Sequence, residues 1–231
     1  MCVHRLPRVA LAGLNCNQRK DMAMARKERN AEKSRRDILA AAEEQFSEKG
    51  FYGARVDEIA QQAQINKRMI YEYFENKETL YKKVLFEVYH RMESAEKELL
   101  KNDLSGKELI GGIISTYFDF LAENTSFVNI LMWENLNKGK YLEEMPAEQV
   151  RRQTLNIFCE KIIEGKRAGI FLPEVDEKQT VLSLIVVCFA NFSNRYTLSR
   201  LFSKNLTEKE ILENRKQHTL DLVLSYMCGK N

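Results

Sequence analysis

Two amphipathic segments in the first third of the sequence are each only about two helical turns long. Segments 56–63 and 67–74 both place their apolar residues at helical spacing. Isolated helices shorter than ~12–15 residues are marginal in water, so both segments must pack against a neighbour. The preceding segment, 25–46, carries an apolar face at four-residue spacing and can serve as that neighbour. The three segments together predict a small three-helix unit.

The link between the two short segments, residues 63–66, has the length of the turn in a helix-turn-helix motif. Asn66 is a good N-cap for the second segment, where Ile70 and Phe74 lie on one face and can be buried. The other side chains can then enter a DNA major groove, where they offer cations, phenols and one apolar group. Alternatively, the tyrosines are core aromatics and the cations only solvate the surface. The outward positions are Lys67, Arg68, Met69, Tyr71 and Tyr73.

The remainder of the chain also has helical periodicity. With only 10 Gly and 3 Pro in 231 residues and 44% apolar residues, the composition favours a mostly helical globular protein. We predict an all-α fold in which a three-helix domain (25–76) precedes a larger helical domain (77–231). Residues 1–24 are expected to be a disordered leader or sequence upstream of the true start. Further helices are predicted at 77–100, 108–124, 127–136, 147–165, 177–202 and 207–227, the last opened by a capping box at Thr207 and Glu210.

Positive charge is concentrated near the N-terminus. Residues 1–36 hold 10 basic and 3 acidic residues, whereas residues 82–231 hold 21 of each. A basic end on a neutral body indicates a polyanionic partner at that end, the alternative being a solvated basic arm. Lys77, at the predicted start of a helix, combines an ammonium group with free backbone N–H groups and suits a phosphate.

Residues 54–80, ARVDEIAQQAQINKRMIYEYFENKETL, resemble the DNA-binding signature of TetR/AcrR-type transcriptional regulators. The matching features, within 34–81, are KGF, V-x-x-IA-x-x-A, K-x-x-x-Y-x-x-F and K-E-x-L. Two positions depart from the pattern: Gln64 replaces the usual Gly of the turn, and Arg55 replaces a capping Ser or Thr, each at a cost of about 1 kcal/mol. The resemblance implies contacts with double-stranded DNA by Arg55, Lys67, Arg68, Met69, Tyr71, Tyr73, Lys77, Lys33 and Arg36.

The same resemblance implies that the larger domain binds a small-molecule effector and forms a homodimer through 177–202 and 207–227. The first of these segments is apolar nearly all round, so it is buried on several sides, by a partner subunit or within the monomer. The candidate ligand-binding residues are mostly aromatic, and the alternative is that they form an ordinary core. They are Tyr117, Phe118, Phe127, Trp133, Phe158, Phe189, Asn191, Phe192 and Arg195.

Other classes of protein find little support. The five Cys are far apart and the three His lack metal-ligand spacing, so we expect no metal, no cofactor and a reducing, cytoplasmic location. An enzyme needs a nucleophile–base pair or a phosphate-binding glycine loop, and the sequence offers neither. A membrane-surface role is disfavoured because the basic arm lacks a large apolar face. The predicted function is that of a ligand-responsive DNA-binding regulator, most simply a repressor, with effector and operator undetermined.

Overall fold

The computed structural model describes residues 16–146 and 153–229, without the side chains of 16–23 and 27. Every regular element in this part of the chain is a helix, which confirms the predicted all-α class. The helices are α1 (Cys16–Gly53), α2 (Val56–Gln62), α3 (Lys67–Phe74), α4 (Lys77–Leu100), α5 (Gly106–Glu123), α6 (Thr125–Leu136), α7 (Lys140–Glu143), α9 (Gln153–Arg167), α10 (Glu177–Ser193), α11 (Arg195–Phe202) and α12 (Lys209–Cys228).

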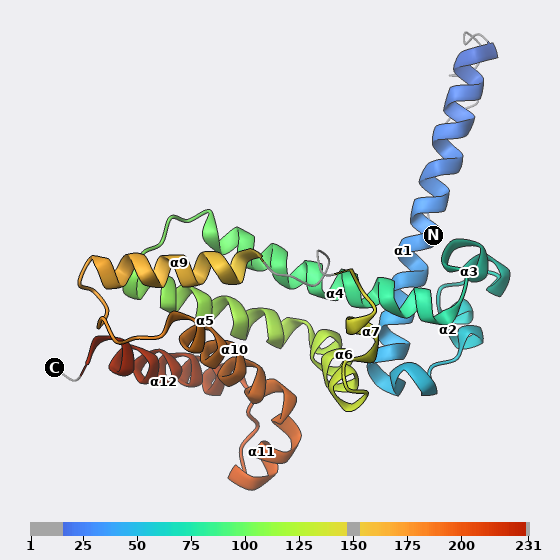
Figure 1. Ribbon diagram of the computed structural model, residues 1–231. Coiled ribbons are helices and arrows are strands. Elements are labelled where there is room, and N and C mark those ends of the chain that lie inside the picture. The colour runs from blue at the N-terminus through green and yellow to red at the C-terminus, as the bar shows by residue number, and fades with distance from the viewer. Residues whose placement is uncertain (1–15, 147–152, 230–231) are drawn as a thin grey trace.

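Helix α1 begins earlier than the sequence pattern predicts. It includes residues 16–24, which were assigned to a leader, while residues 1–15 lie outside the described residues. Good helix formers such as Met, Ala, Lys and Arg, with no Gly or Pro between Cys16 and Gly50, explain the extension. The N-terminal half of α1 projects away from the rest of the molecule (Figure 1).

We call α1, α2 and α3 the head. Their shared core contains Phe46, Ile59, Ile70 and Phe74, all less than 7% exposed. The turn between α2 and α3 is closed by the backbone of Ile65, whose N–H donates to the Ala60 carbonyl at 3.0 Å. The two short helices are therefore held by packing on α1, as their length requires.

Two local features of the head were anticipated from the sequence. Gln64 adopts a left-handed backbone conformation with φ of 54°, as expected at the turn position where a glycine is usual. Asn66 caps α3, because its side-chain oxygen accepts a hydrogen bond from the Arg68 N–H at 2.9 Å. The cap fixes the first turn of α3 directly after the turn.

Gly50 interrupts α1 a few residues after the predicted segment 25–46, and about one further helical turn follows. Its φ of 66° and ψ of 178° are accessible essentially only to glycine. A Cβ atom at this position would lie 2.7 Å from Cδ2 of Trp133 on α6. The bare backbone thus lets the indole ring pack directly on the head.

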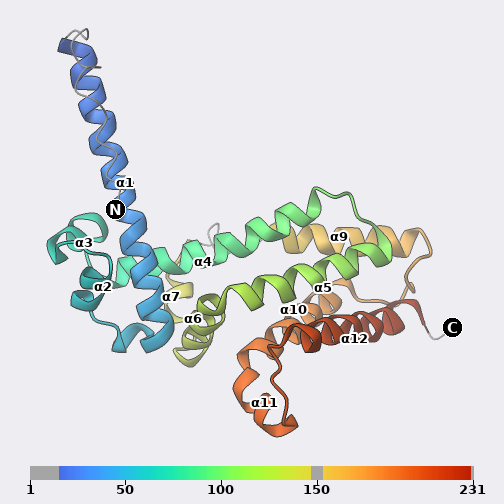
Figure 2. The same cartoon turned by 180° about the vertical axis from the view of Figure 1, so that it is seen from behind.

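Helix α4 runs from the head into the remaining helices, which we call the body (α5–α12; Figure 1). Asn76 caps its start by accepting a hydrogen bond from the Thr79 N–H at 2.9 Å, and α4 ends at Leu100, close to the predicted position. Seen from behind, α12 lies along the outside of the body beside α5 and α10 (Figure 2).

A cluster of aromatic rings joins head and body. Tyr81 of α4 contacts Phe46 and Phe51 of α1 with ring centroids 4.8 and 5.2 Å apart, and Tyr141 of α7 at 5.0 Å. The Tyr81 hydroxyl donates to the buried Glu134 carboxylate of α6 at 2.9 Å. This junction ties α1, α4, α6 and α7 into one packed unit.

The predicted single helix 177–202 is wrong: it is two helices, α10 and α11, bent by 74° at Asn194. Side chains compete with the backbone at this point. The Asn194 amide donates to the Ala190 carbonyl at 3.1 Å, and the Arg195 guanidinium donates to the Phe192 carbonyl at 3.4 Å. Such local side-chain bonds offer the chain an alternative to continuing a helix.

The predicted capping box at the start of the last helix is also wrong. Helix α12 begins at Lys209, with Glu208 as its N-cap. The Thr207 hydroxyl instead donates to the Asn205 side-chain oxygen at 2.8 Å, and the Thr207 N–H bonds to the same oxygen at 3.1 Å. Thr207 therefore bonds to Asn205, in the loop before α12, and not to the first turn of the helix. The predicted start of helix 147–165 lies outside the described residues, and α9 is described from Gln153.

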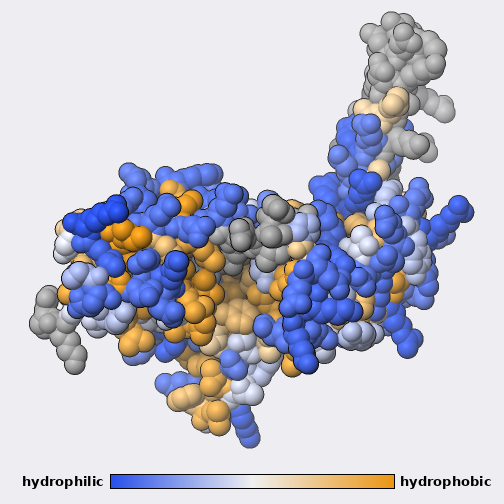
Figure 3. All heavy atoms as spheres, in the orientation of Figure 1, coloured by the Kyte–Doolittle hydropathy of each residue, from blue (hydrophilic) through white to orange (hydrophobic). Residues whose placement is uncertain are grey.

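Hydrophilic side chains cover much of the head, while apolar ones gather over α10 and α11 (Figure 3). In the described ranges no single helix is long and apolar enough to cross a membrane. Helices α10 and α11 reach that length and composition only as a bent pair.

Candidate nucleic-acid interface

Helix α3 presents the predicted contact residues outward. Ile70 and Phe74 are buried against the head core. On the opposite side Lys67 and Arg68 are exposed and Tyr71 is 43% exposed. Met69 and Tyr73 are half-buried and flank this face. The short amphipathic segment therefore gives a rigid helix whose exposed face carries two cations and a phenol.

Two cations of the head are positioned by neighbours. The Lys67 ammonium contacts the Asp57 carboxylate of α2 at 2.8 Å, and this contact raises the pKa of Lys67. The Arg35 guanidinium lies 5.1 Å from the centre of the Tyr73 ring, within cation–π distance. Both contacts link α3 to the helix beside it and orient long side chains that would otherwise be free.

The other predicted contact residues surround α3. Arg55 is the N-cap of α2 and makes no capping side-chain bond, as its departure from the Ser or Thr pattern leads one to expect. Its side chain is exposed, as are those of Lys33 and Arg36 on α1. Cations from α1, α2 and α3 thus flank the same end of the molecule.

Lys77 is placed differently from the others. It is half-buried at the first residue of α4, and its ammonium lies 4.8 Å from the centre of the Phe51 ring. Burial lowers the pKa of Lys77. Lys77 therefore sits at the edge of the aromatic junction as well as at the helix start where a phosphate was predicted.

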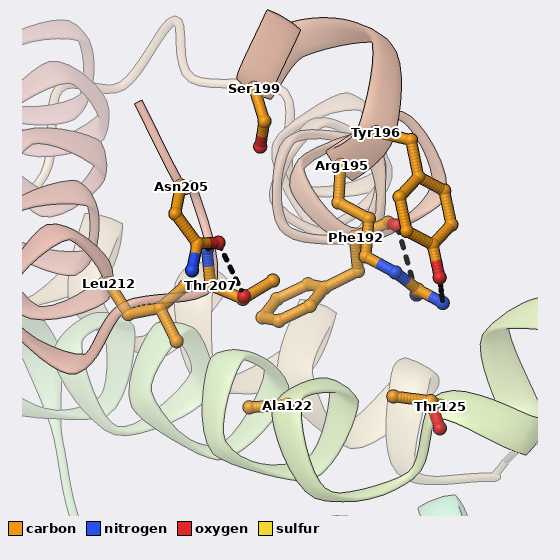
Figure 4. Close-up of a pocket in the computed structure, with 9 residues that line it drawn as sticks. All are labelled: Ala122, Thr125, Phe192, Arg195, Tyr196, Ser199, Asn205, Thr207 and Leu212. Carbon is orange, nitrogen blue, oxygen red and sulfur yellow. Dashed lines mark hydrogen bonds between the residues drawn. The ribbon is translucent and has the colours of Figure 1, made fainter. Parts of the chain in front are cut away.

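The body contains a cavity of about 510 Å³ beside the bend between α10 and α11. Two of the predicted ligand-binding residues, Phe192 and Arg195, line it. Figure 4 shows the Phe192 ring in the middle, with Arg195 on one side of it and Leu212 on the other. The complete lining is Ala122, Thr125, Phe192, Arg195, Tyr196, Ser199, Asn205, Thr207 and Leu212.

The other seven predicted residues lie outside this cavity lining. Phe118 contacts the Phe192 ring from the core side, with centroids 5.7 Å apart, and Tyr117 donates a hydrogen bond to the buried Glu96 at 2.5 Å. Trp133 packs on Gly50 at the head. Phe127, Phe158, Phe189 and Asn191 are buried or half-buried among the body helices.

Sequence reasoning missed most of the polar lining. Tyr196, Ser199, Asn205 and Thr207 come together only because the chain bends at Asn194 and returns through a loop to α12. The one available signal was the polar run 193–197, which interrupts an otherwise apolar segment. Such a run favours a helix end over a continuous helix.

A short capped helix, held outward after a left-handed turn on a three-helix head, defines a helix-turn-helix DNA-binding protein. Comparison with protein-family models agrees. Residues 38–84 match the model described as "Bacterial regulatory proteins, tetR family", and residues 107–223, about half of the chain, match "Tetracyclin repressor-like, C-terminal domain". The chain belongs to the TetR family, whose members are transcriptional regulators.

The individual relatives share less than a third of their residues with this chain. The transcriptional repressor NicS of Pseudomonas putida is 29% identical over 197 residues, which cover 84% of this chain and 92% of NicS. A putative transcriptional regulator from Streptomyces coelicolor, SCO4942, has the same fold with a TM-score of 0.66 and 22% identity, covering 84% of this chain and 98% of the other. FadR from Bacillus subtilis, solved in complex with stearoyl-CoA, has a TM-score of 0.65 and 22% identity, and the match covers 83% of this chain and 98% of FadR.

Proposed function

We propose that this protein is a dimeric, ligand-responsive transcriptional repressor that is released from its operator by a small-molecule effector. The observation that carries the proposal is the outward face of α3, with Lys67, Arg68 and Tyr71 exposed beside exposed cations of α1 and α2. Repression, as opposed to activation, is supported by the name of the Pseudomonas putida relative. Ligand control is supported by the cavity in the body and by the stearoyl-CoA complex of the Bacillus subtilis neighbour.

On DNA, α3 is the recognition helix and enters the major groove. Lys67, Arg68 and Met69 read base edges, while Tyr71 binds a phosphate and Tyr73 adds a contact on the same face. Lys77 binds a phosphate near the start of α4. Arg55, Lys33 and Arg36 add further contacts to the sugar–phosphate backbone, which position the head without reading sequence.

The dimer forms through α10 and α12. Leu182 and Val186 lie four residues apart on α10 and are 53% and 54% exposed. Leu222 and Tyr226 repeat this spacing on α12 and are 57% and 56% exposed. Covering both apolar stripes with the same stripes of a second subunit gives a two-fold interface. Two α3 helices can then reach successive major grooves, whose centres are about 34–36 Å apart.

The boundary between the DNA-binding domain (25–76) and the ligand-binding and dimerisation domain (77–231) falls at the start of α4. Helix α6 offers a mechanical link between the two domains, because Thr125 at its start lines the cavity and Trp133 near its end packs on Gly50. Its 12 residues span roughly 18 Å at the helical rise. An effector releases DNA only if it binds better to the conformer whose heads do not match the operator.

The protein acts in the cytoplasm, where bacterial DNA is found, and it has no catalytic role. Membership of a family of transcriptional regulators supports both statements. The three cysteines whose side chains the structure describes, Cys159, Cys188 and Cys228, are free thiols, which fits a reducing compartment.

Fluorescence anisotropy with the DNA upstream of the coding region, against a scrambled duplex and at two salt concentrations, tests the proposal. We expect sequence-dependent binding that weakens with salt. Tyr71→Phe and Lys77→Ala should weaken binding to all sequences, whereas Lys67→Ala and Arg68→Ala should alter sequence preference. Lys101→Ala, which removes an exposed cation at the far end of α4, is the matched control.

If the Tyr71, Lys77, Lys67 and Arg68 variants all bind like the wild type, the assignment of α3 as the recognition helix is wrong. If the native and scrambled duplexes bind alike, an operator selected from random DNA replaces the upstream region in the same assay.

Sedimentation equilibrium of Leu222→Glu tests the dimer, and we expect this variant to be monomeric.

A further inference from the structure

We propose that the cavity between α5, α10 and α11 binds a small organic carboxylate, an aromatic or short aliphatic monocarboxylic acid, and that Arg195 holds its carboxylate group. This inference deepens the proposed function and rests on it, because it names the chemical class of the effector. It is carried by a cation that is buried at the cavity and whose hydrogen-bond partners in the described part of the chain are all neutral.

Arg195 is only 9% exposed, although it is a charged residue that lines the cavity. Its guanidinium donates to the Phe192 carbonyl at 3.4 Å, to the Asn129 side-chain oxygen at 3.4 Å and to the Tyr196 hydroxyl at 3.1 Å. No carboxylate lies within ion-pair distance of it among residues 16–146 and 153–229, wherever side chains are described.

Burying an arginine beside neutral groups alone is unfavourable, because the desolvation cost of the charge is only partly offset. Two of the three hydrogen bonds of Arg195 are long at 3.4 Å, and such bonds are weak. An anion bound beside the guanidinium would offset this cost. The guanidinium is a planar fork that matches a carboxylate with two parallel hydrogen bonds.

The neighbours of Arg195 complete an anion site. The Tyr196 hydroxyl accepts a hydrogen bond from Arg195, so its own proton remains to be donated to a bound oxygen. Thr125 lies across from the guanidinium (Figure 4). It is also the first residue of α6, whose N-cap Asn124 makes no capping side-chain bond. The positive end of the α6 dipole therefore lies at the cavity wall, next to Thr125.

The remaining walls define the rest of the ligand. The Phe192 ring, Leu212 and Ala122 form an apolar surface that suits an aromatic ring or a short alkyl chain. A volume of about 510 Å³ lies within the range typical of sites for small organic ligands. The polar side chains opposite Arg195 include Thr207 and Asn205, which are bonded to each other.

The test measures ligand binding without DNA, by isothermal titration calorimetry on the full chain. The probes are benzoate, phenylacetate and hexanoate, each compared with its neutral amide, together with inorganic phosphate and stearoyl-CoA. We expect at least one acid to bind at least 10-fold more tightly than its amide, because only the acid accepts two charge-assisted hydrogen bonds. The same acid should bind at least 10-fold more tightly than phosphate, which has no apolar group to cover the Phe192 ring.

The variants separate the role of Arg195 from a structural one. Arg195→Gln should remove the preference for acid over amide, and Arg195→Lys should keep a reduced preference because the charge remains without the fork. Arg200→Gln on the same helix is the matched control, since Arg200 is exposed and outside the cavity lining. Wild-type affinity and acid preference are expected for this control.

Four results would overturn the inference: no acid binds, the amides bind as tightly as the acids, phosphate binds as tightly as the acids, or Arg195→Gln keeps the wild-type preference. Loss of the dimer in both Arg195 variants would also overturn it, because Arg195 would then pair with the partner subunit. Operator release is measured separately by anisotropy. Acid binding without release leaves the site intact and refutes effector control. Release by stearoyl-CoA when no acid binds keeps the proposed function and refutes the carboxylate site.

Discussion

Lys67 in the head and Arg195 in the body are two cations in opposite settings. The Lys67 ammonium is exposed and contacts the Asp57 carboxylate at 2.8 Å. The Arg195 guanidinium is buried and contacts only a carbonyl, an amide and a phenol. The exposed cation has an acidic partner, whereas the buried one has none in the described part of the chain.

The difference fits what each region is proposed to bind. An exposed ion pair is worth at most about 1 kcal/mol, so Lys67 can exchange Asp57 for a DNA phosphate or a base at little cost. Burying a cation without an anion costs more desolvation free energy, and a ligand that supplies the anion offsets that cost. The contacts of the head are therefore sensitive to salt, whereas those of the buried guanidinium are screened much less.

The largest effect is expected where the two regions touch. Gly50→Ala places a Cβ atom 2.7 Å from the Trp133 ring at a backbone conformation that only glycine adopts readily. Strain and clash together should lower the free energy of unfolding by about 2–5 kcal/mol, measured in urea. Gly139→Ala is the control, since Gly139 is also left-handed but has nothing within 4 Å. Equal losses in both variants would show that the indole contact contributes nothing.

A smaller loss is expected for the hydrogen bond that joins α4 and α6. Tyr81→Phe leaves the buried Glu134 without its hydroxyl donor, while its second oxygen has no hydrogen-bond partner in the described residues. The free energy of unfolding should fall by about 1.5–3 kcal/mol. The double variant Tyr81→Phe, Glu134→Leu removes both polar partners and should be more stable than Tyr81→Phe alone. A double variant that is less stable than the single one would contradict this account.

The head was predictable in detail because its structure depends on short-range signals. Asn66 and Asn76 cap the helices that follow them, and Gln64 takes the left-handed conformation that the turn requires. Ile70 and Phe74 face inward because they lie one turn apart on a helix too short to be stable alone. Each feature depends on residues within a few positions in the sequence.

The body was predictable only as a set of helices. Aromatic residues such as Phe158 and Trp133 have the same periodicity whether they line a cavity, fill a core or pack on another domain. The position of the cavity is set by the bend at Asn194, where side chains of Asn194 and Arg195 bond to the Ala190 and Phe192 carbonyls. The cavity is lined by residues from α5, α6, α10, α11, the loop before α12 and α12 itself, and no local sequence pattern predicts that they lie together.

The role of the Lys67–Asp57 pair can be tested directly. Asp57→Asn removes a negative charge beside Lys67 and should tighten DNA binding about 2- to 5-fold at low salt, because an exposed pair is worth less than about 1 kcal/mol. The gain should shrink as salt is raised. Glu98→Gln, in an exposed pair with Lys101 far from the head, is the control in the same anisotropy titration. Weaker binding of Asp57→Asn would mean that Asp57 positions Lys67 for DNA.

The smallest effect is expected at the turn. Gln64→Gly relieves the strain of a left-handed residue but increases the conformational entropy of the unfolded chain. The free energy of unfolding should therefore rise by no more than about 1 kcal/mol. Gln61→Gly places the same residue in α2, where glycine should lower that free energy by about 1 kcal/mol. The two variants have the same composition and lie three residues apart, so opposite signs in urea unfolding isolate the backbone conformation. Similar losses in both would mean that position 64 carries no strain, and the turn would owe its shape to packing alone.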